Sequence, residues 1–264
     1  MNTDALISQG VEILCPASVH IDATIIPERI ASRDVRIHQG CHIAGRWTFI
    51  SDGVRIGTEG PVTLVNCWIG PGVELKNGYF ENAVFLEGAK LGAGSHVRAG
   101  TILEEHSSTA HCVGLKQTIL FPYVTLGSLI NFCDCLMAGG TSRKDHSEVG
   151  SSFIHFNYTP NQDKATASLI GDVPGGVMLN RNPIFLGGQG GLVGPCRIAY
   201  GTIIAAGCVH RKDQLTPDRL VFDGSSRGGS VPYETGVYRS VKRQAVSNVI
   251  YIANLLALMA WYVH

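Results

Sequence analysis

The segment LGAGSHVRAGTI, residues 91–102, decides the fold, because an aliphatic residue recurs in it every six positions among glycines and small residues. Leu91 and Val97 mark this spacing. A period of six fits neither an amphipathic helix nor an ordinary alternating strand. It is typical of hexapeptide-repeat parallel β-helices, in which each repeat supplies a short strand and a turn.

The same spacing continues on both sides of this segment and predicts aliphatic side chains stacked coil on coil. Each such side chain contributes about 1.5–3 kcal/mol when it is buried, and glycine permits the backbone angles that a corner needs. We therefore expect an all-β fold, a left-handed parallel β-helix with three repeats per coil; its handedness rests on likeness to other hexapeptide proteins. The residues expected to point inward are Ile37, Ile43, Ile50, Ile56, Val62, Ile69, Leu75, Tyr79, Phe85, Leu91, Val97, Leu103, Leu186, Leu192, Ile198 and Ile204.

Breaks in the repeat divide the chain into four predicted parts. They are an N-terminal lead-in (1–33), the β-helix (34–211), an extended polar loop (212–240) and a C-terminal helix (241–264). The apolar run at residues 249–263 of that helix is short for a membrane span. We expect the helix to cap the last coil or to pack between subunits, because an open coil end presents unpaired strand edges. Membrane attachment is the alternative.

Composition limits the classes of function. The formal net charge is zero and 16% of the residues are charged, so a chain-wide attraction to nucleic acid is absent. The eight cysteines form no CxxC pair, and we interpret them as small buried hydrophobic residues in a reducing compartment. Residues 1–13 show neither the basic flank nor the apolar run of an export signal, so we expect a cytoplasmic protein.

One interruption of the repeat is rich in hydrogen-bonding groups. The stretch VGSSFIHFNYTPNQDKATASLIGD, residues 149–172, places a polar loop between two aliphatic–glycine units. Loops on a rigid scaffold often carry chemistry, so we expect a functional site here. A solvated excursion, in which the Asn and Asp residues only make turns, is the alternative.

Residues 116–227 resemble the acetyltransferase domain of the bifunctional N-acetylglucosamine-1-phosphate uridylyltransferase / glucosamine-1-phosphate acetyltransferase. The resemblance extends to proteins described as UDP-N-acetylglucosamine pyrophosphorylase-related. It implies a homotrimer with active sites in grooves between neighbours and acetyl-CoA as the acyl donor. The motifs that carry it are FNY at 156–158, TASLIGD at 166–172, FLGGQGGLVGP at 185–195 and GTIIAAGCVHRKD at 201–213.

The resemblance also implies roles for single residues. Asn157 and Tyr158 correspond to contacts with the sugar phosphate and the acyl acceptor. Lys116 lies near a phosphate-binding lysine of the family, and Lys164 lies beside another lysine position. The residues that would bind acetyl-CoA are Ser151, Gly188 and Ala206 along its groove and Arg227 toward its phosphates.

The sequence departs from the family at the general base. Ser128 stands in place of the family's histidine, and Asn131 in place of a tyrosine. Taking a proton from an amine near neutral pH suits an imidazole and not an unassisted serine. His155 is two residues before Asn157 and would share its strand face, so we predict His155 as the replacement base. A histidine packed and hydrogen-bonded for structure is the alternative.

Three functions stay open. The first is an acyltransferase acting on a sugar phosphate or nucleotide sugar, with acetyl-CoA as donor. The second is a non-catalytic nucleotide-sugar-binding or regulatory module that has lost the base. The third is a metalloenzyme resembling γ-class carbonic anhydrases; His106 and His111 have the raw spacing but lack the neighbouring motifs, so we predict no metal site. The residues before the repeats contain no glycine-rich nucleotide loop, so uridylyltransferase activity is not expected from them.

Overall fold

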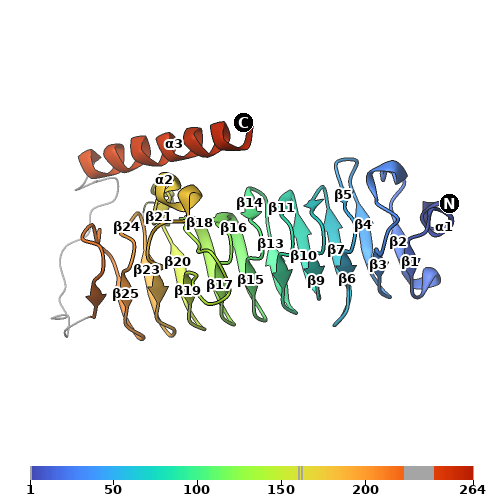
Figure 1. The fold of residues 1–264 in the computed structure, drawn as a ribbon, viewed down its shortest axis with the longest axis horizontal. Coiled ribbons are helices and arrows are strands. Elements are labelled where there is room, and N and C mark those ends of the chain that lie inside the picture. Colours follow the sequence, from blue (N-terminus) through green and yellow to red (C-terminus); the bar gives the residue numbers. More distant parts are fainter. Residues whose placement is uncertain (1, 160, 162, 223–240, 264) are drawn as a thin grey trace.

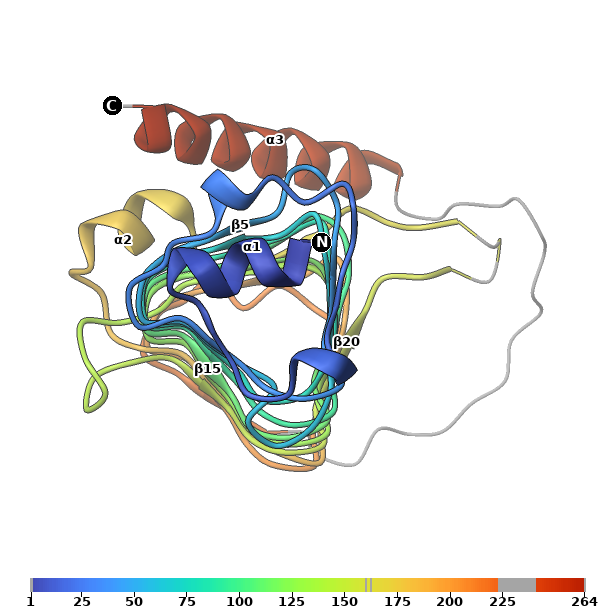
Figure 2. The same ribbon diagram turned by 90° about the vertical axis from the view of Figure 1, so that its right-hand side faces the viewer.

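The chain winds into a long prism of short parallel strands (Figure 1), and the view along the prism shows that it has three sides (Figure 2). The computed structural model describes residues 2–159, 161, 163–222 and 241–263. Successive strands of a coil lie on successive faces of the prism. On each face, strands of neighbouring coils pair in parallel and in register. The predicted parallel β-helix with a C-terminal helix is therefore confirmed.

Face 1 is a sheet of eleven two-residue strands. From β1 to β25 the second residue of each strand is buried in the prism, so the inward residues stack in one column. Its strands are β1 (Glu12–Ile13), β3 (Arg36–Ile37), β6 (Arg55–Ile56), β9 (Glu74–Leu75), β12 (Lys90–Leu91), β15 (Ser108–Thr109), β17 (Thr125–Leu126), β19 (Glu148–Val149), β22 (Phe185–Leu186), β25 (Ile203–Ile204) and β27 (Leu220–Val221).

Face 2 follows face 1 along the chain and carries most of the residues discussed below. Two of its strands, β16 and β18, are seven residues long and bend around a corner into face 3. The strands of face 2 are β2 (His20–Ile21), β4 (His42–Ala44), β7 (Val62–Val65), β10 (Gly78–Glu81), β13 (Ser95–Val97), the first halves of β16 (Gly114–Leu120) and β18 (Asn131–Met137), β20 (Ile154–Phe156), β23 (Gly191–Val193) and β26 (Val209–His210).

Face 3 closes each coil. Figure 2 looks along the prism from the N-terminal end, and there the chain runs counter-clockwise from face 1 to face 2 to face 3 as it recedes. The coil is therefore left-handed, as predicted. The strands of face 3 are β5 (Phe49–Ile50), β8 (Trp68–Ile69), β11 (Ala83–Phe85), β14 (Thr101–Leu103), the second halves of β16 and β18, β21 (Ser168–Ile170) and β24 (Arg197–Ile198).

The inward residues match the six-residue prediction at every position but one. At that position Phe80 is fully buried, and Tyr79, the predicted inward residue, is half-buried on the outer side. The reason is a shorter corner. Only Asn82 separates β10 from β11, so the inward residues Phe80 and Phe85 are five positions apart rather than six.

The strands extend beyond the predicted limits of the β-helix. They begin at Glu12, inside the predicted lead-in 1–33, and reach Val221, inside the predicted polar loop 212–240. Residues 223–240 of that loop lie outside the described residues. The short helices of the chain are α1 (Asn2–Gln9), the 3-10 turns η1 (Pro16–Ser18) and η2 (Pro27–Arg29), and α2 (Val173–Met178).

The C-terminal helix α3 (Val241–Val263) lies obliquely across face 3 (Figures 1 and 2). Its inner side packs against face 3 and α2, where Leu258 is buried with Phe121 and Leu136. Asn254 Oδ1 also accepts a hydrogen bond of 2.8 Å from the backbone N–H of Val173 in α2. The expectation that the helix caps the last coil is therefore wrong, because its apolar partners are on face 3. By length and composition alone, α3 is the one helix among the described residues that could cross a membrane.

Candidate functional site

The corner between faces 1 and 2 brings three predicted residues together. Ser151, Gly188 and Ala206 occupy it in successive coils. The N–H of Gln189 donates to the carbonyl of Ser151 at 2.8 Å, and the N–H of Gly207 donates to that of Gly188 at 2.9 Å. A Cβ at Gly188 would lie 2.6 Å from the Ser151 carbonyl oxygen, so only glycine fits there. Their role in coenzyme binding stays a prediction.

The fourth residue predicted to contact the coenzyme, Arg227, lies outside the described residues.

Asn157 closes the loop that leaves the prism after β20. Its side chain is buried, with the residue 3% exposed, and its amide nitrogen donates to the carbonyls of Ala165 at 2.6 Å and Thr166 at 3.2 Å. The amide therefore holds the loop shut, and the contact of Asn157 with the sugar phosphate and the acyl acceptor stays a prediction. Tyr158 comes next and is exposed, paired across the loop with Lys164.

Lys164 folds back from this loop onto the corner between faces 2 and 3. Its Nζ lies 3.0 Å from Asp134 Oδ2 and 3.0 Å from Gln117 Oε1. Asp134 and Gln117 are the corner residues of β18 and β16, with positive φ angles of 58° and 49°. The lysine thus has partners within the chain that fasten the loop to the prism, which is a structural role that the sequence did not predict.

His155 lies inside the prism. It stacks in register between Phe132 of β18 and Leu192 of β23 and is 1% exposed. Its Nδ1 lies 2.5 Å from the carbonyl oxygen of Cys133, and its Nε2 lies 2.8 Å from Ser168 Oγ. Both ring nitrogens therefore have partners inside the core.

Burial also changes the basicity of His155. Desolvation lowers the pKa of its imidazole from 6.5 to about 4, although the neighbouring Cys133 carbonyl favours the charged form. A base in the groove must reach the proton that it removes, and His155 faces the interior. Its prediction as the general base is wrong, and the alternative of a hydrogen-bonded structural histidine agrees with the geometry.

A groove opens on face 2 above Gly114, with a volume of about 440 Å³. In successive coils His96, Gly114, Asn131 and Ile154 are direct neighbours across the strands. These four residues form an outer column on face 2. Because Gly114 has no side chain, the column has a hollow at this position, which His96 borders on one side and Asn131 on the other. The groove therefore carries an exposed imidazole within a row of strand-held residues.

Two cationic side chains, Arg98 and Lys116, lie at or beside this groove. Arg98 lines the groove and is exposed. Its backbone N–H donates to the Leu115 carbonyl at 2.9 Å, and this hydrogen bond places Arg98 beside Lys116 of β16. His96 and Arg98 flank the buried Val97, so their side chains leave the same face. Sequence reasoning found Lys116 but missed His96 and Arg98. The signal was present in SHVRAG, where ionisable residues occupy both outward positions around an inward valine.

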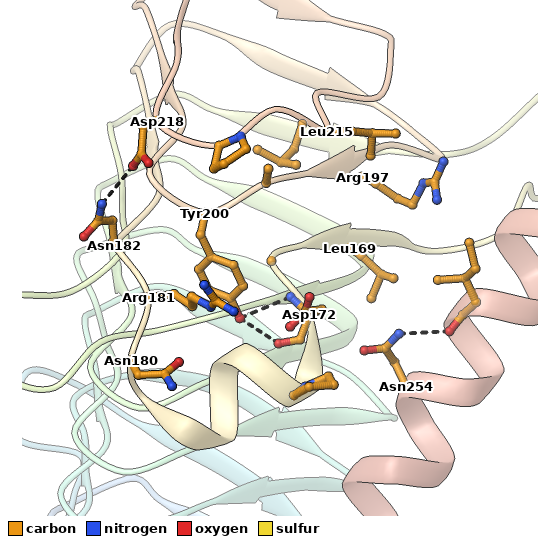
Figure 3. Close-up of a pocket in the computed structure, with 16 residues that line it drawn as sticks. Leu169, Asp172, Asn180, Arg181, Asn182, Arg197, Tyr200, Leu215, Asp218 and Asn254 are labelled. Atoms are coloured by element: carbon orange, nitrogen blue, oxygen red, sulfur yellow. Dashed lines mark hydrogen bonds between the residues drawn. The ribbon is translucent and has the colours of Figure 1, made fainter.

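Another pocket lies elsewhere, between α2, α3 and the coils that contain β21 and β24 (Figure 3). Its volume is about 610 Å³. The Tyr200 hydroxyl projects into it and donates to the Asp172 carbonyl at 2.7 Å, while the Asp172 N–H donates back at 3.2 Å. None of the predicted site residues that the structure describes lines this pocket. We take the groove on face 2 as the candidate site, because the solvent-facing imidazole of His96 and the guanidinium of Arg98 line it, with Lys116 beside Arg98.

Comparison with known proteins finds relatives named Bifunctional protein GlmU. No family model matches the chain. The Bifunctional protein GlmU of Pelobacter propionicus is 27% identical over 214 residues, which cover 81% of this chain and 41% of the relative. The chain is similar to GlmU. The GlmU of Methylococcus capsulatus is 29% identical over 232 residues, or 86% of this chain and 44% of the relative.

GlmU of Geotalea uraniireducens shows the same proportions, with 28% identity over 219 residues that cover 83% of this chain and 42% of the relative. The chain therefore spans less than half the length of the GlmU proteins that it matches. The motifs at 156–158, 166–172, 185–195 and 201–213 predict a resemblance to one part of a bifunctional protein, and the similarity to GlmU confirms it.

Proposed function

We propose that this chain is an acyltransferase that moves an acetyl group from acetyl-CoA to an amino group of a sugar phosphate or nucleotide sugar. The similarity to GlmU supports an acyltransferase-like role in UDP-N-acetylglucosamine biosynthesis. The observation that carries the proposal is the groove above Gly114, which His96 and Arg98 line, with Lys116 next to Arg98 on the outer side of face 2.

In this proposal His96 is the general base. The amine nitrogen attacks the thioester carbonyl, a C–N bond forms and the C–S bond breaks. The nitrogen loses a proton to the imidazole, and the departing thiolate of the coenzyme takes up a proton. An exposed imidazole suits this task near neutral pH, and His96 is in the groove whereas His155 is not.

The cations bind the acceptor. Arg98 and Lys116 lie beside one another next to the groove, and a phosphate group is a ligand that both side chains recognise. The corner of Ser151, Gly188 and Ala206 lies at the opposite edge of face 2 and would hold the coenzyme. A donor and an acceptor placed at the two edges would meet over the strands of this face.

We also propose that the protein is a cytoplasmic homotrimer. The groove is open to one side in the single chain, as expected of a half-site that a neighbouring subunit completes. Sedimentation equilibrium of the full chain would give three times the 28.3 kDa chain mass. A monomer that is fully active would contradict the trimer.

Thiol release from acetyl-CoA tests the reaction, with a panel of amino-sugar phosphates and nucleotide sugars as acceptors. His96→Gln should lower kcat by about 10²–10⁴-fold, the usual contribution of a general base. His38→Gln, several coils away, is the matched control and should keep full activity. Lys116→Met should raise KM for phosphorylated acceptors and leave KM for acetyl-CoA unchanged. Absence of thiol release and of coenzyme binding across the panel would overturn the proposal.

A further inference from the structure

Two histidines and a carboxylate meet on face 2 near the N-terminal end of the prism, far along the chain from the groove above Gly114. His20 of β2 and His42 of β4 are direct partners across the parallel strands, with ring centroids 4.8 Å apart. Asp22 is two residues after His20 and leaves the same face. One ligand atom from each of the three side chains lies within 4.8 Å of the others.

His42 has an unsatisfied buried atom. Its Nε2 is buried and has no hydrogen-bond partner among the residues that the structure describes. A buried polar atom without a partner destabilises the folded state. A bound cation at this nitrogen would remove that destabilisation, so the orphaned atom is an observation independent of the clustering.

The carboxylate is already oriented. Asp22 Oδ1 accepts hydrogen bonds from the backbone N–H of Thr24 at 2.8 Å and from its hydroxyl at 2.6 Å. Carboxylates that ligate metals are commonly held by such outer hydrogen bonds. Both histidines belong to paired strands, which hold ligands more rigidly than loops do.

We infer that His20, Asp22 and His42 form a site for a divalent transition-metal ion of the zinc type. Two imidazoles and one carboxylate suit Zn²⁺, Co²⁺ or Fe²⁺, whereas Mg²⁺ and Ca²⁺ prefer sites made of oxygen alone. Tetrahedral zinc with bonds of about 2.0–2.2 Å holds its ligand atoms roughly 3.4 Å apart. The side chains must therefore close by up to about 1.4 Å from their present spread of 4.8 Å. Three protein ligands leave the fourth position to water or to an incoming molecule.

The test uses the full chain without a polyhistidine tag, dialysed against a chelator and then titrated with Co²⁺ and Zn²⁺. We expect one ion per chain, a visible absorption band of four-coordinate cobalt that Zn²⁺ abolishes, and a higher melting temperature with Zn²⁺. His42→Asn should weaken Zn²⁺ binding by about tenfold or more. His111→Asn, an exposed histidine several coils away, is the control and should bind as the unmodified chain does.

Asp22→Asn serves as a second variant that keeps the shape of the side chain. Circular dichroism would establish that each variant is folded before binding is measured. The inference is overturned if the unmodified chain binds no Zn²⁺ at micromolar concentrations. It is equally overturned if a folded His20→Asn/His42→Asn double variant keeps the stoichiometry of one.

Discussion

The ammonium of Lys164 lies 3.0 Å from a carboxylate oxygen of Asp134, whose side chain is only 10% exposed, while that of the lysine is 42% exposed. Asp134 turns the corner between faces 2 and 3, and Lys164 belongs to the loop that leaves the next coil. The ion pair therefore joins the loop to the prism beneath it.

Loss of this pair should be measurable. Lys164→Met leaves the Asp134 carboxylate without its cation, so we expect the free energy of unfolding to fall by about 1–2 kcal/mol. Urea denaturation measures the change. The control is Lys76→Met, which removes the exposed pair with Glu59 and should cost less than about 0.5 kcal/mol. Equal losses in the two variants would show that burial of Asp134 does not matter.

Glu104 predicts a pH dependence of stability. The residue is 5% exposed, and burial raises the pKa of its carboxyl from 4.5 to about 7, although a hydrogen bond from the Tyr262 hydroxyl of α3 opposes the rise. The folded state therefore holds this proton more tightly than the unfolded state. The contribution of Glu104 to the free energy of unfolding is therefore fully present below pH 4.5 and is lost as the pH rises through 7. This loss lowers the free energy of unfolding by about 3 kcal/mol.

The comparison with Glu104→Gln isolates this contribution, because glutamine does not titrate. The free energy of unfolding of the unmodified chain, minus that of the variant, should fall between pH 4.5 and pH 7.5. Glu87→Gln, at an exposed position, is the control and should leave the pH profile unchanged. A flat difference for Glu104→Gln would mean that water reaches this carboxyl.

His155 predicts the opposite pH trend. Its folded-state pKa of about 4 lies below the ordinary value of 6.5. The contribution of His155 to the free energy of unfolding is therefore fully present above pH 6.5 and is lost as the pH falls through 4. His155→Leu should abolish this part of the acid sensitivity, measured by urea denaturation between pH 4 and pH 7. The folded variant should also keep its acyltransfer activity, and a loss of kcat without unfolding would return His155 to the catalytic machinery.

Gly114 controls the space in the groove. A Cβ at this position would lie 3.2 Å from Asn131 Oδ1, so Gly114→Ala narrows the hollow without a backbone clash. We expect the melting temperature to stay within a few degrees, while KM for the acceptor rises. Gly191→Ala, on the same outer column three coils further, is the control for stability. An unchanged KM in Gly114→Ala would place the acceptor elsewhere.

The repeat could be predicted from the sequence because residues close together in the chain determine it. An aliphatic residue every six positions, with glycine at the corners, selects the coil wherever it occurs, and Leu91 and Val97 point inward as predicted. Tyr79 was predicted wrongly because counting in sixes assumes corners of constant length, and the corner at Asn82 is shorter.

The three-dimensional arrangement decided the site. The alternation of a strand places His155 and Asn157 on one face, but only the stacking of His155 on Phe132 and Leu192 shows that this face is the interior. The groove above Gly114 depends on His96 and Asn131, which contacts between coils bring together. The sequence alone determined the prism, since its period is set by neighbouring residues. Which polar groups face solvent, and where α3 lies, depended on packing between residues distant in the chain.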